Sequence, residues 1–141
     1  MTLLEYVITR QKFASYLHGP IHWAHVQSNG LRLAQERRVN IQVVRLFALF
    51  HDSQRLTDGE DLAHGHRAAE LSAELRGPWY ELDDASFEKL QYAIAYHADG
   101  LLSAEPTIGT CWDADRLDLQ RCGIRPDRRM MSTDAGRNEC R

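Results

Sequence analysis

The sequence has few cysteines, no long apolar run and no long alternation of apolar and polar residues. Its three cysteines, Cys111, Cys122 and Cys140, are odd in number and lack CxxC spacing, so neither a disulfide framework nor a thiolate zinc site is predicted. No apolar stretch approaches the roughly 20 residues that cross a bilayer. The first twelve residues contain an acidic Glu5 and no small-residue cleavage site. We therefore expect a cytoplasmic protein with no membrane segment.

Blocks of one charge are also missing. The formal net charge of -3 at pH 7 comes from interspersed acids and bases, which gives no reason to expect a nucleic-acid partner. A chain of 141 residues is long enough for one ordinary domain that buries about two-thirds of the surface of its unfolded form. We expect residues 1–141 to form a single domain, with its core at about residues 18–125, and a small-molecule partner.

The abundant signal is helical periodicity, because apolar residues recur at steps of three and four through most of the chain. This pattern predicts an all-α protein, a compact bundle of about six helices. The expected helices cover roughly residues 3–18, 20–38, 40–52, 62–75, 85–98 and 107–119. The polar tail from about Arg125 is rich in Arg and Gly and is expected to be frayed.

Two of the expected helices carry a more specific prediction. The segment 40–52 is apolar nearly all round, with Asn40 as a candidate N-cap, so it should be the central and most buried helix. In the helix that begins at Pro20, the residues expected to face inward are Ile21, Val26, Leu31 and Leu33.

All seven histidines lie between positions 18 and 97. Neutral imidazole and carboxylate are ligands of borderline transition metals, and four of them from different helices can surround an ion in a bundle. His51 and Asp52 directly follow an apolar helix, where an ionised carboxylate needs a cation or hydrogen bonds to compensate it. His22, His51, Asp52 and Asp115 are such a set of four. The alternative is structural: an Asp that accepts helix N–H bonds and a core imidazole.

Three motifs stand in the order HWAHV at 22–26, HD at 51–52 and DADRLDL at 113–119. This order resembles the HD superfamily of metal-dependent phosphohydrolases, and the resemblance covers about residues 18–125. It implies a compact HD-domain-like bundle in which the metal ligands are His22, His51, Asp52 and Asp115. Asp115 is chosen because Ala precedes it and Leu follows two positions later; Asp113 and Asp118 are expected on the helix surface or beside a ligand.

Two further matches suggest a second metal ion. Binuclear members of the superfamily have a His after the HD loop and another before a late DG, and this chain has His64 in HGHRAAE and His97 in HADG. The resemblance therefore implies one or two divalent ions, with Mn, Fe, Zn, Ni, Co and Mg all open. The alternative is that His64 and His97 are structural.

The resemblance implies a metal-dependent phosphohydrolase that attacks a small phosphate ester, a nucleotide among the candidates, with a metal-activated water. Asp52 and Arg55 are the expected catalytic residues: Asp52 bridges ions or accepts a proton, and Arg55 holds a phosphate oxygen. Alternatively, Arg55 is a solvated arginine or one paired with Asp58 or Asp61. Two other functions remain open, namely a metal- or ligand-binding module without activity and a di-iron oxygenase of the same fold.

Overall fold

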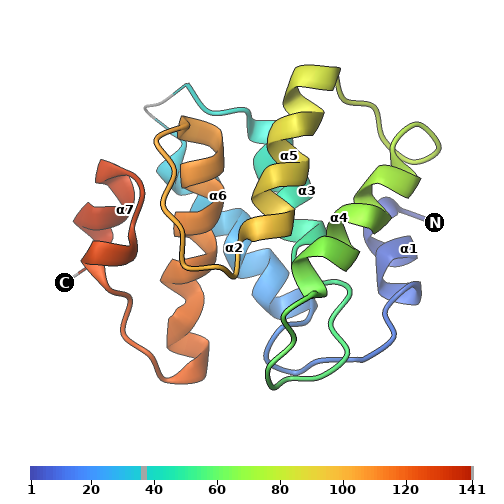
Figure 1. The fold of residues 1–141 in the computed structure, drawn as a ribbon, viewed down its shortest axis with the longest axis horizontal. Helices are drawn as coiled ribbons and strands as arrows, with labels where there is room; N and C mark the ends of the chain where they lie inside the picture. The colour runs from blue at the N-terminus through green and yellow to red at the C-terminus, as the bar shows by residue number, and fades with distance from the viewer. Residues whose placement is uncertain (36–37, 141) are drawn as a thin grey trace.

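The computed structural model describes residues 1–35 and 38–140, and over these residues the chain is helical with no strand (Figure 1). This confirms the predicted all-α bundle. The α-helices are α1 (Leu3–Thr9), α2 (Pro20–Leu33), α3 (Ile41–Phe50), α4 (His64–Leu75), α5 (Asp84–Tyr96), α6 (Pro106–Leu117) and α7 (Asp134–Glu139), with two 3-10 helices, η1 (Asp118–Cys122) and η2 (Arg128–Met130). Within the described ranges, no helix is both long enough and apolar enough to cross a membrane.

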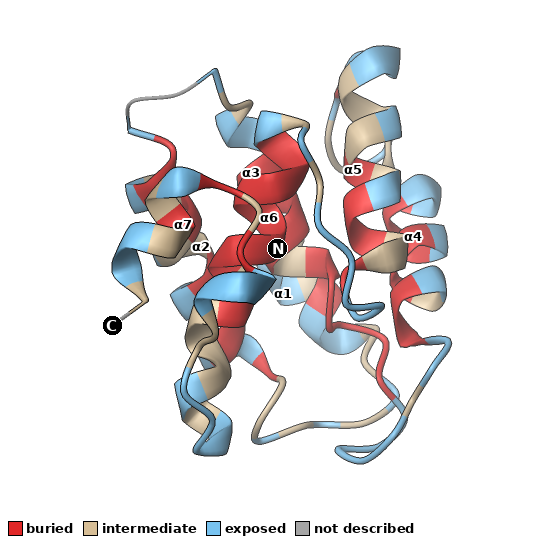
Figure 2. Ribbon diagram, turned by 60° about the vertical axis from the view of Figure 1, so that its left-hand side comes forward, coloured by how far each residue is buried: buried red, intermediate tan, exposed pale blue. Residues whose placement is uncertain are grey.

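Helix α3 lies at the centre of the bundle, as predicted, and is buried over most of its length (Figure 2). It contacts α1, α2, α4, α5 and α6, and its Phe47 and Phe50 are fully buried. Each such aromatic side chain contributes about 1.5–3 kcal/mol through its removal from water. The Asn40 side chain accepts a hydrogen bond from the Val43 N–H at 3.2 Å, which confirms Asn40 as the N-cap.

A glycine allows α4 and α5 to approach closely. A Cβ atom at Gly65 would lie 2.6 Å from the Ala95 carbonyl oxygen of α5, so only glycine fits there without a shift of backbone. The adjacent His64 at the start of α4 therefore comes close to the end of α5, where His97 follows the last helical turn.

The first two helices differ from the prediction in length and in their buried face. Helix α1 ends at Thr9 rather than near residue 18, and α2 ends at Leu33; part of the expected extension to Arg38, residues 36–37, lies outside the described residues. Ile21 is 69% exposed, whereas the neighbouring His22 is buried. Apolar periodicity failed here because a polar imidazole, not the adjacent isoleucine, takes the inward position.

The tail is also more ordered than expected, because α7 packs against α6 at one end of the molecule (Figure 1). Met131 is buried, and the Asp113 carboxylate of α6 accepts hydrogen bonds from the backbone N–H groups of Ser132 at 2.6 Å and Thr133 at 2.8 Å. The Thr133 hydroxyl adds a third hydrogen bond at 2.6 Å. Asp113 is therefore neither a surface residue nor a neighbour of a ligand: it is fully buried and attaches the tail to α6.

Candidate metal centre

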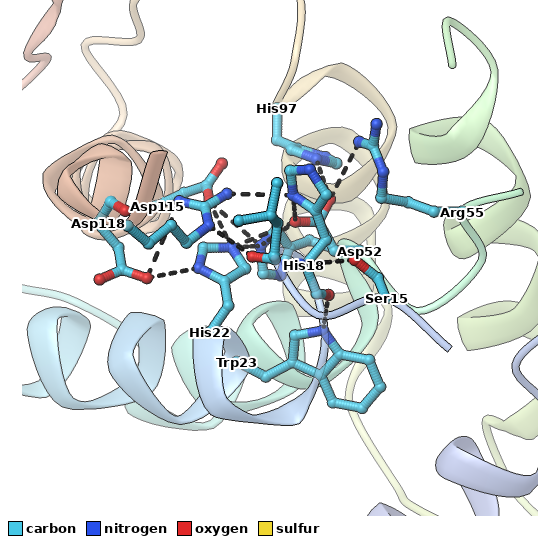
Figure 3. Close-up of polar contacts among 12 residues, drawn as sticks. Ser15, His18, His22, Trp23, Asp52, Arg55, His97, Asp115 and Asp118 are labelled. Atoms are coloured by element: carbon cyan, nitrogen blue, oxygen red, sulfur yellow. Dashed lines mark hydrogen bonds and ion pairs between the residues drawn. The ribbon is translucent and has the colours of Figure 1, made fainter. Parts of the chain in front are cut away.

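Four predicted ligands from three parts of the bundle converge in one buried cluster, here called the first cluster: His22, His51, Asp52 and Asp115 (Figure 3). The His22 Nε2 atom lies 3.1 Å from His51 Nε2, 3.2 Å from Asp52 Oδ2 and 3.1 Å from Asp115 Oδ1. His51 Nε2 lies 3.2 Å from Asp115 Oδ1 and 3.4 Å from Asp52 Oδ2. His22, His51 and Asp52 are buried, and the Asp115 side chain is 15% exposed.

The other Asp52 oxygen faces a second cluster, formed by Asp52, His64 and His97. The two imidazole Nε2 atoms are 2.9 Å apart, and they lie 3.1 Å and 3.2 Å from Asp52 Oδ1. Both histidines are buried. The structure thus brings all six predicted ligands together and places Asp52 between the two groups, with one oxygen directed to each.

Backbone carbonyl groups on the side away from the clusters fix the orientation of three imidazole rings. A carbonyl oxygen can only accept a hydrogen bond, so an Nδ1 atom next to one must carry the proton. His51 Nδ1 donates to the Phe47 carbonyl at 3.1 Å, His97 Nδ1 to that of Ile94 at 2.7 Å and His64 Nδ1 to that of Asp61 at 2.6 Å. In their neutral forms, these three histidines therefore present the Nε2 lone pair to the clusters.

His22 is oriented by a carboxylate instead of a carbonyl. Its Nδ1 atom lies 2.7 Å from Asp118 Oδ2, and the other Asp118 oxygen lies 3.1 Å from His25 Nδ1. Figure 3 shows Asp118 on the side of the His22 ring opposite to the cluster. Asp118 thus lies beside His22, one of the predicted ligands, where a carboxylate fixes the ring and raises its basicity.

The spacing and chemistry of the donors fit a divalent transition metal. Five of the six distances between the four donor atoms are 3.1–3.4 Å. A tetrahedral ion with bonds of about 2.0 Å, the zinc–nitrogen and zinc–oxygen length, separates its ligands by about 3.3 Å. Nε2 lone pairs and ionised carboxylates repel one another at these distances, and a cation removes that repulsion. The buried His/Asp cluster can therefore hold a metal ion.

The charges of the cluster support the same conclusion. Burial raises the pKa values of Asp52 and Asp115, but the charge of His51 and the surrounding imidazole hydrogen bonds outweigh burial and hold both pKa values well below the ordinary range. Burial lowers the pKa of His22, whereas hydrogen bonds to Asp115 and Asp52 raise it, with a net value of about 10. Without a metal, the two anionic carboxylates are compensated by imidazoles; a divalent cation can take over that role.

Arg55 lies at the edge of the second cluster. It is 8% exposed, and its Nη1 atom is 3.3 Å from His64 Nε2 and 4.0 Å from Asp52 Oδ1. The rest of the guanidinium is held by the following loop, through the carbonyls of Thr57 at 3.0 Å and Gly59 at 2.6 Å. Arg55 is thus neither a solvated arginine nor the partner of Asp58 or Asp61, since Asp61 pairs with Arg67 and Asp58 bonds to Ser15.

A cavity of about 420 Å³ opens over the two clusters. Asp52, His64, His97 and Asp115 contribute to its lining, together with four arginines, Arg55, Arg116, Arg121 and Arg125. Its remaining wall is largely apolar and comes from Leu119, Ile124, Met130 and Met131. Most of this wall belongs to residues 116–131, the part of the chain that includes the expected frayed tail.

Two lining residues illustrate what the sequence analysis missed. His18 Nδ1 lies 3.4 Å from Asp52 Oδ2 and 3.2 Å from Arg121 Nη2, while the Trp23 indole donates to the His18 carbonyl at 2.7 Å. His18 stands four positions before His22, so helical spacing could have suggested a shared face, although α2 begins only at Pro20. Arg121 had no recognisable signal in the sequence.

A scan against models of protein families, a search of curated proteins and a search of solved structures found no match to this chain.

Proposed function

We propose that the protein is a metal-dependent phosphohydrolase of the HD type that acts on a small phosphate ester. The observation that carries this proposal is the convergence of four imidazole Nε2 atoms and two carboxylates beside a cavity that both carboxylates and four arginines line. The resemblance of the motifs HWAHV, HD and DADRLDL to the HD superfamily supports it. The donor set alone suits a metal; the arginines above it suit an anionic substrate.

The charge of the cavity supports an anionic substrate. Its lining contains four arginines and three aspartates, Asp52, Asp115 and Asp127, which gives a formal charge of about +1 with neutral histidines. One divalent ion in the first cluster would raise this to about +3. A positive, partly enclosed cavity concentrates anions and strengthens their hydrogen bonds to arginine.

The residues of the centre have separate tasks in such a hydrolysis. A bound divalent ion supplies an acidified water and positive charge next to the phosphorus ester. Asp52, shared by both clusters, would bridge two ions or, with only one ion bound, accept a proton from the attacking water with its other oxygen. Arg55 Nη1, at the rim of the second cluster, is placed to donate a hydrogen bond to a phosphate oxygen and to stabilise developing negative charge. The carbonyls of Thr57 and Gly59 keep that guanidinium in position.

The test is a substrate panel on protein freed of metal and then loaded separately with Mn, Fe, Zn, Ni, Co or Mg. Phosphate release is measured from phosphomonoesters, and alcohol or nucleoside release from phosphodiesters. We expect turnover of at least one class that requires added metal and is lost in His51→Ala. The matched control is His66→Ala, because His66 is an exposed histidine of α4 outside both clusters.

Two outcomes would overturn the proposal. One is protein that binds metal at the clusters and hydrolyses no ester in the panel with any of the six metals, as a non-catalytic module would. The other is oxygen consumption by the iron-loaded protein in the absence of ester hydrolysis, which is the behaviour of a di-iron oxygenase.

A further inference from the structure

Arg116 is a buried cation whose hydrogen-bonding capacity is largely unused. It follows Asp115 on α6, lines the cavity and is 7% exposed. Its Nη1 atom donates to the Met130 carbonyl at 2.8 Å, but its Nη2 atom is buried and has no hydrogen-bond partner. The guanidinium carbon lies 5.5 Å from the centroid of the Trp112 ring.

The nearby carboxylates do not form an ion pair with Arg116 within the described part of the chain. Asp113 accepts its hydrogen bonds from Ser132 and Thr133, and Asp115 belongs to the first cluster. A buried guanidinium with an unsatisfied N–H group is costly, so its retention beside a cavity needs a compensating ligand.

The other arginines of the cavity differ in how many hydrogen-bond partners their guanidinium groups already have. Arg121 is occupied by the Leu17 and Asp118 carbonyls and by His18, and Arg55 is held by its own loop. Arg125, which is exposed, forms no hydrogen bond or ion pair among residues 1–35 and 38–140. Arg116 and Arg125 are therefore the cations of the cavity that remain free to meet an anion away from Arg55.

We propose that Arg116 binds a second anionic group of the substrate, so that the substrate carries two anionic groups, one at the metal centre and one at Arg116. This inference rests on the proposed function for the first of the two groups. Arg125 adds positive charge at the exposed side of the same cavity, and the apolar side chains of Leu119, Ile124 and Met130 contact the short linker between the two groups. A simple phosphomonoester fills only the position at the metal centre.

The segment after η1 fixes the direction of the Arg116 guanidinium. The Met130 carbonyl, which accepts from Arg116 Nη1, lies two positions before Ser132, the first residue that Asp113 attaches to α6. Asp113 thus acts as a positioning residue: it holds the segment that holds Arg116. Arg116 is held through Nη1, and an anion in the cavity would give the buried Nη2 a partner once the guanidinium turns toward it.

The test compares two probes on Mn-loaded protein by isothermal titration calorimetry: propyl phosphate, with one anionic group, and 1,3-propanediol bisphosphate, with two. Wild type should bind the bisphosphate about tenfold more tightly, the usual effect of one charged hydrogen bond. Arg116→Gln, which can still donate to the Met130 carbonyl, should lose that preference and keep the affinity for propyl phosphate. The control Arg45→Gln, at an exposed arginine of α3 outside this cavity, should keep the preference.

The inference is overturned if wild type and Arg116→Gln prefer the bisphosphate equally. It is also overturned if wild type shows no such preference. Should Arg116→Gln fail to fold, the Arg116 Nε–H signal in the NMR spectrum of wild type decides: it should shift with the bisphosphate and not with propyl phosphate, and the absence of such a shift counts against the inference. Failure of the proposed function has a different signature, because propyl phosphate would then bind no more tightly with Mn than without it. A bisphosphate preference that depends on Arg116 supports the second anion position even in that case.

Discussion

The two clusters share Asp52 but differ in the number of donor atoms that they offer to an ion. The first has four protein donors, and its side chains come from α2, the end of α3 and α6. The second has three donors, with the Arg55 guanidinium 3.3 Å from His64 Nε2. Closed four-donor sets are typical of tightly held metals, whereas sets with an open position leave room for water or substrate. Under the proposed function, we therefore expect the more firmly bound ion in the first cluster and the reacting side of the centre at the second.

The largest expected effect comes from the residue that both clusters share. Asp52→Ala removes a donor from each cluster, so the purified protein should lose all stoichiometric metal. Because a ligand bound only by the native state stabilises it by about 4 kcal/mol at a thousandfold excess over Kd, metal should no longer raise the Tm. Elemental analysis and thermal melts with and without Mn measure both effects. Retention of stoichiometric metal by this variant would contradict the role of Asp52.

The second prediction separates the clusters. Wild type in excess metal should bind up to two ions, and His64→Ala combined with His97→Ala should bind at most one, since the first cluster keeps its four donors. Metal per protein is counted after gel filtration, with His66→Ala as the matched control on α4. The same metal content in the double variant and in wild type would show that His64 and His97 are structural.

The third prediction concerns Arg55 at the open side. Loss of a charged contact to a transition state costs about 10²-fold or more in rate, so Arg55→Ala should lower kcat by that order on the best substrate of the panel. Arg55→Lys should recover only part of it, because a point charge cannot reproduce the planar guanidinium. Both variants should keep their metal, measured in the same samples. If metal and activity were lost together, Arg55 would instead serve to hold the Thr57–Gly59 loop; unchanged activity in metal-loaded Arg55→Ala would exclude it from catalysis.

The smallest effect should be on metal affinity, from a change at Asp118, which contacts the far side of the His22 ring. Asp118→Asn removes the negative charge that fixes the His22 ring at 2.7 Å, and loss of such an outer carboxylate commonly weakens metal binding by about 10–100-fold. Competition with a chelator measures the change in affinity at the first cluster. The control is Asp99→Asn, at an exposed aspartate outside both clusters. An affinity equal to that of wild type would mean that the Asp118–His22 contact does not support the cluster.

The central part of the fold could be predicted because its signals are local. Five turns or loops separate the six periodic segments, and Asn40 is a recognisable cap. Both signals depend on neighbours along the chain. The inward position of His22 could not be obtained from apolar periodicity, because burial there is compensated by contacts with His51, Asp115 and Asp118, which are distant in sequence.

Residue chemistry and motif order were enough to predict which six residues meet in the two clusters. They did not predict which residues form the wall of the cavity. The tail is polar, and its order comes from one buried carboxylate, Asp113, that accepts three hydrogen bonds from Ser132 and Thr133. No periodicity records such a pairing. Arg116 was passed over for the same reason: its unsatisfied Nη2 atom becomes visible only when the Met130 segment is in place.

The most direct test of the metal centre is anomalous diffraction from crystals of Mn-loaded protein, with data collected at the manganese absorption edge. We expect a peak between His22 Nε2, His51 Nε2, Asp52 Oδ2 and Asp115 Oδ1, at about 2.0–2.2 Å from each, and a weaker one between Asp52 Oδ1, His64 and His97. A map from crystals soaked in excess Mn with no peak in the first cluster, and with the same donors bonded to one another or to water, would contradict the assignment of these residues as a metal centre.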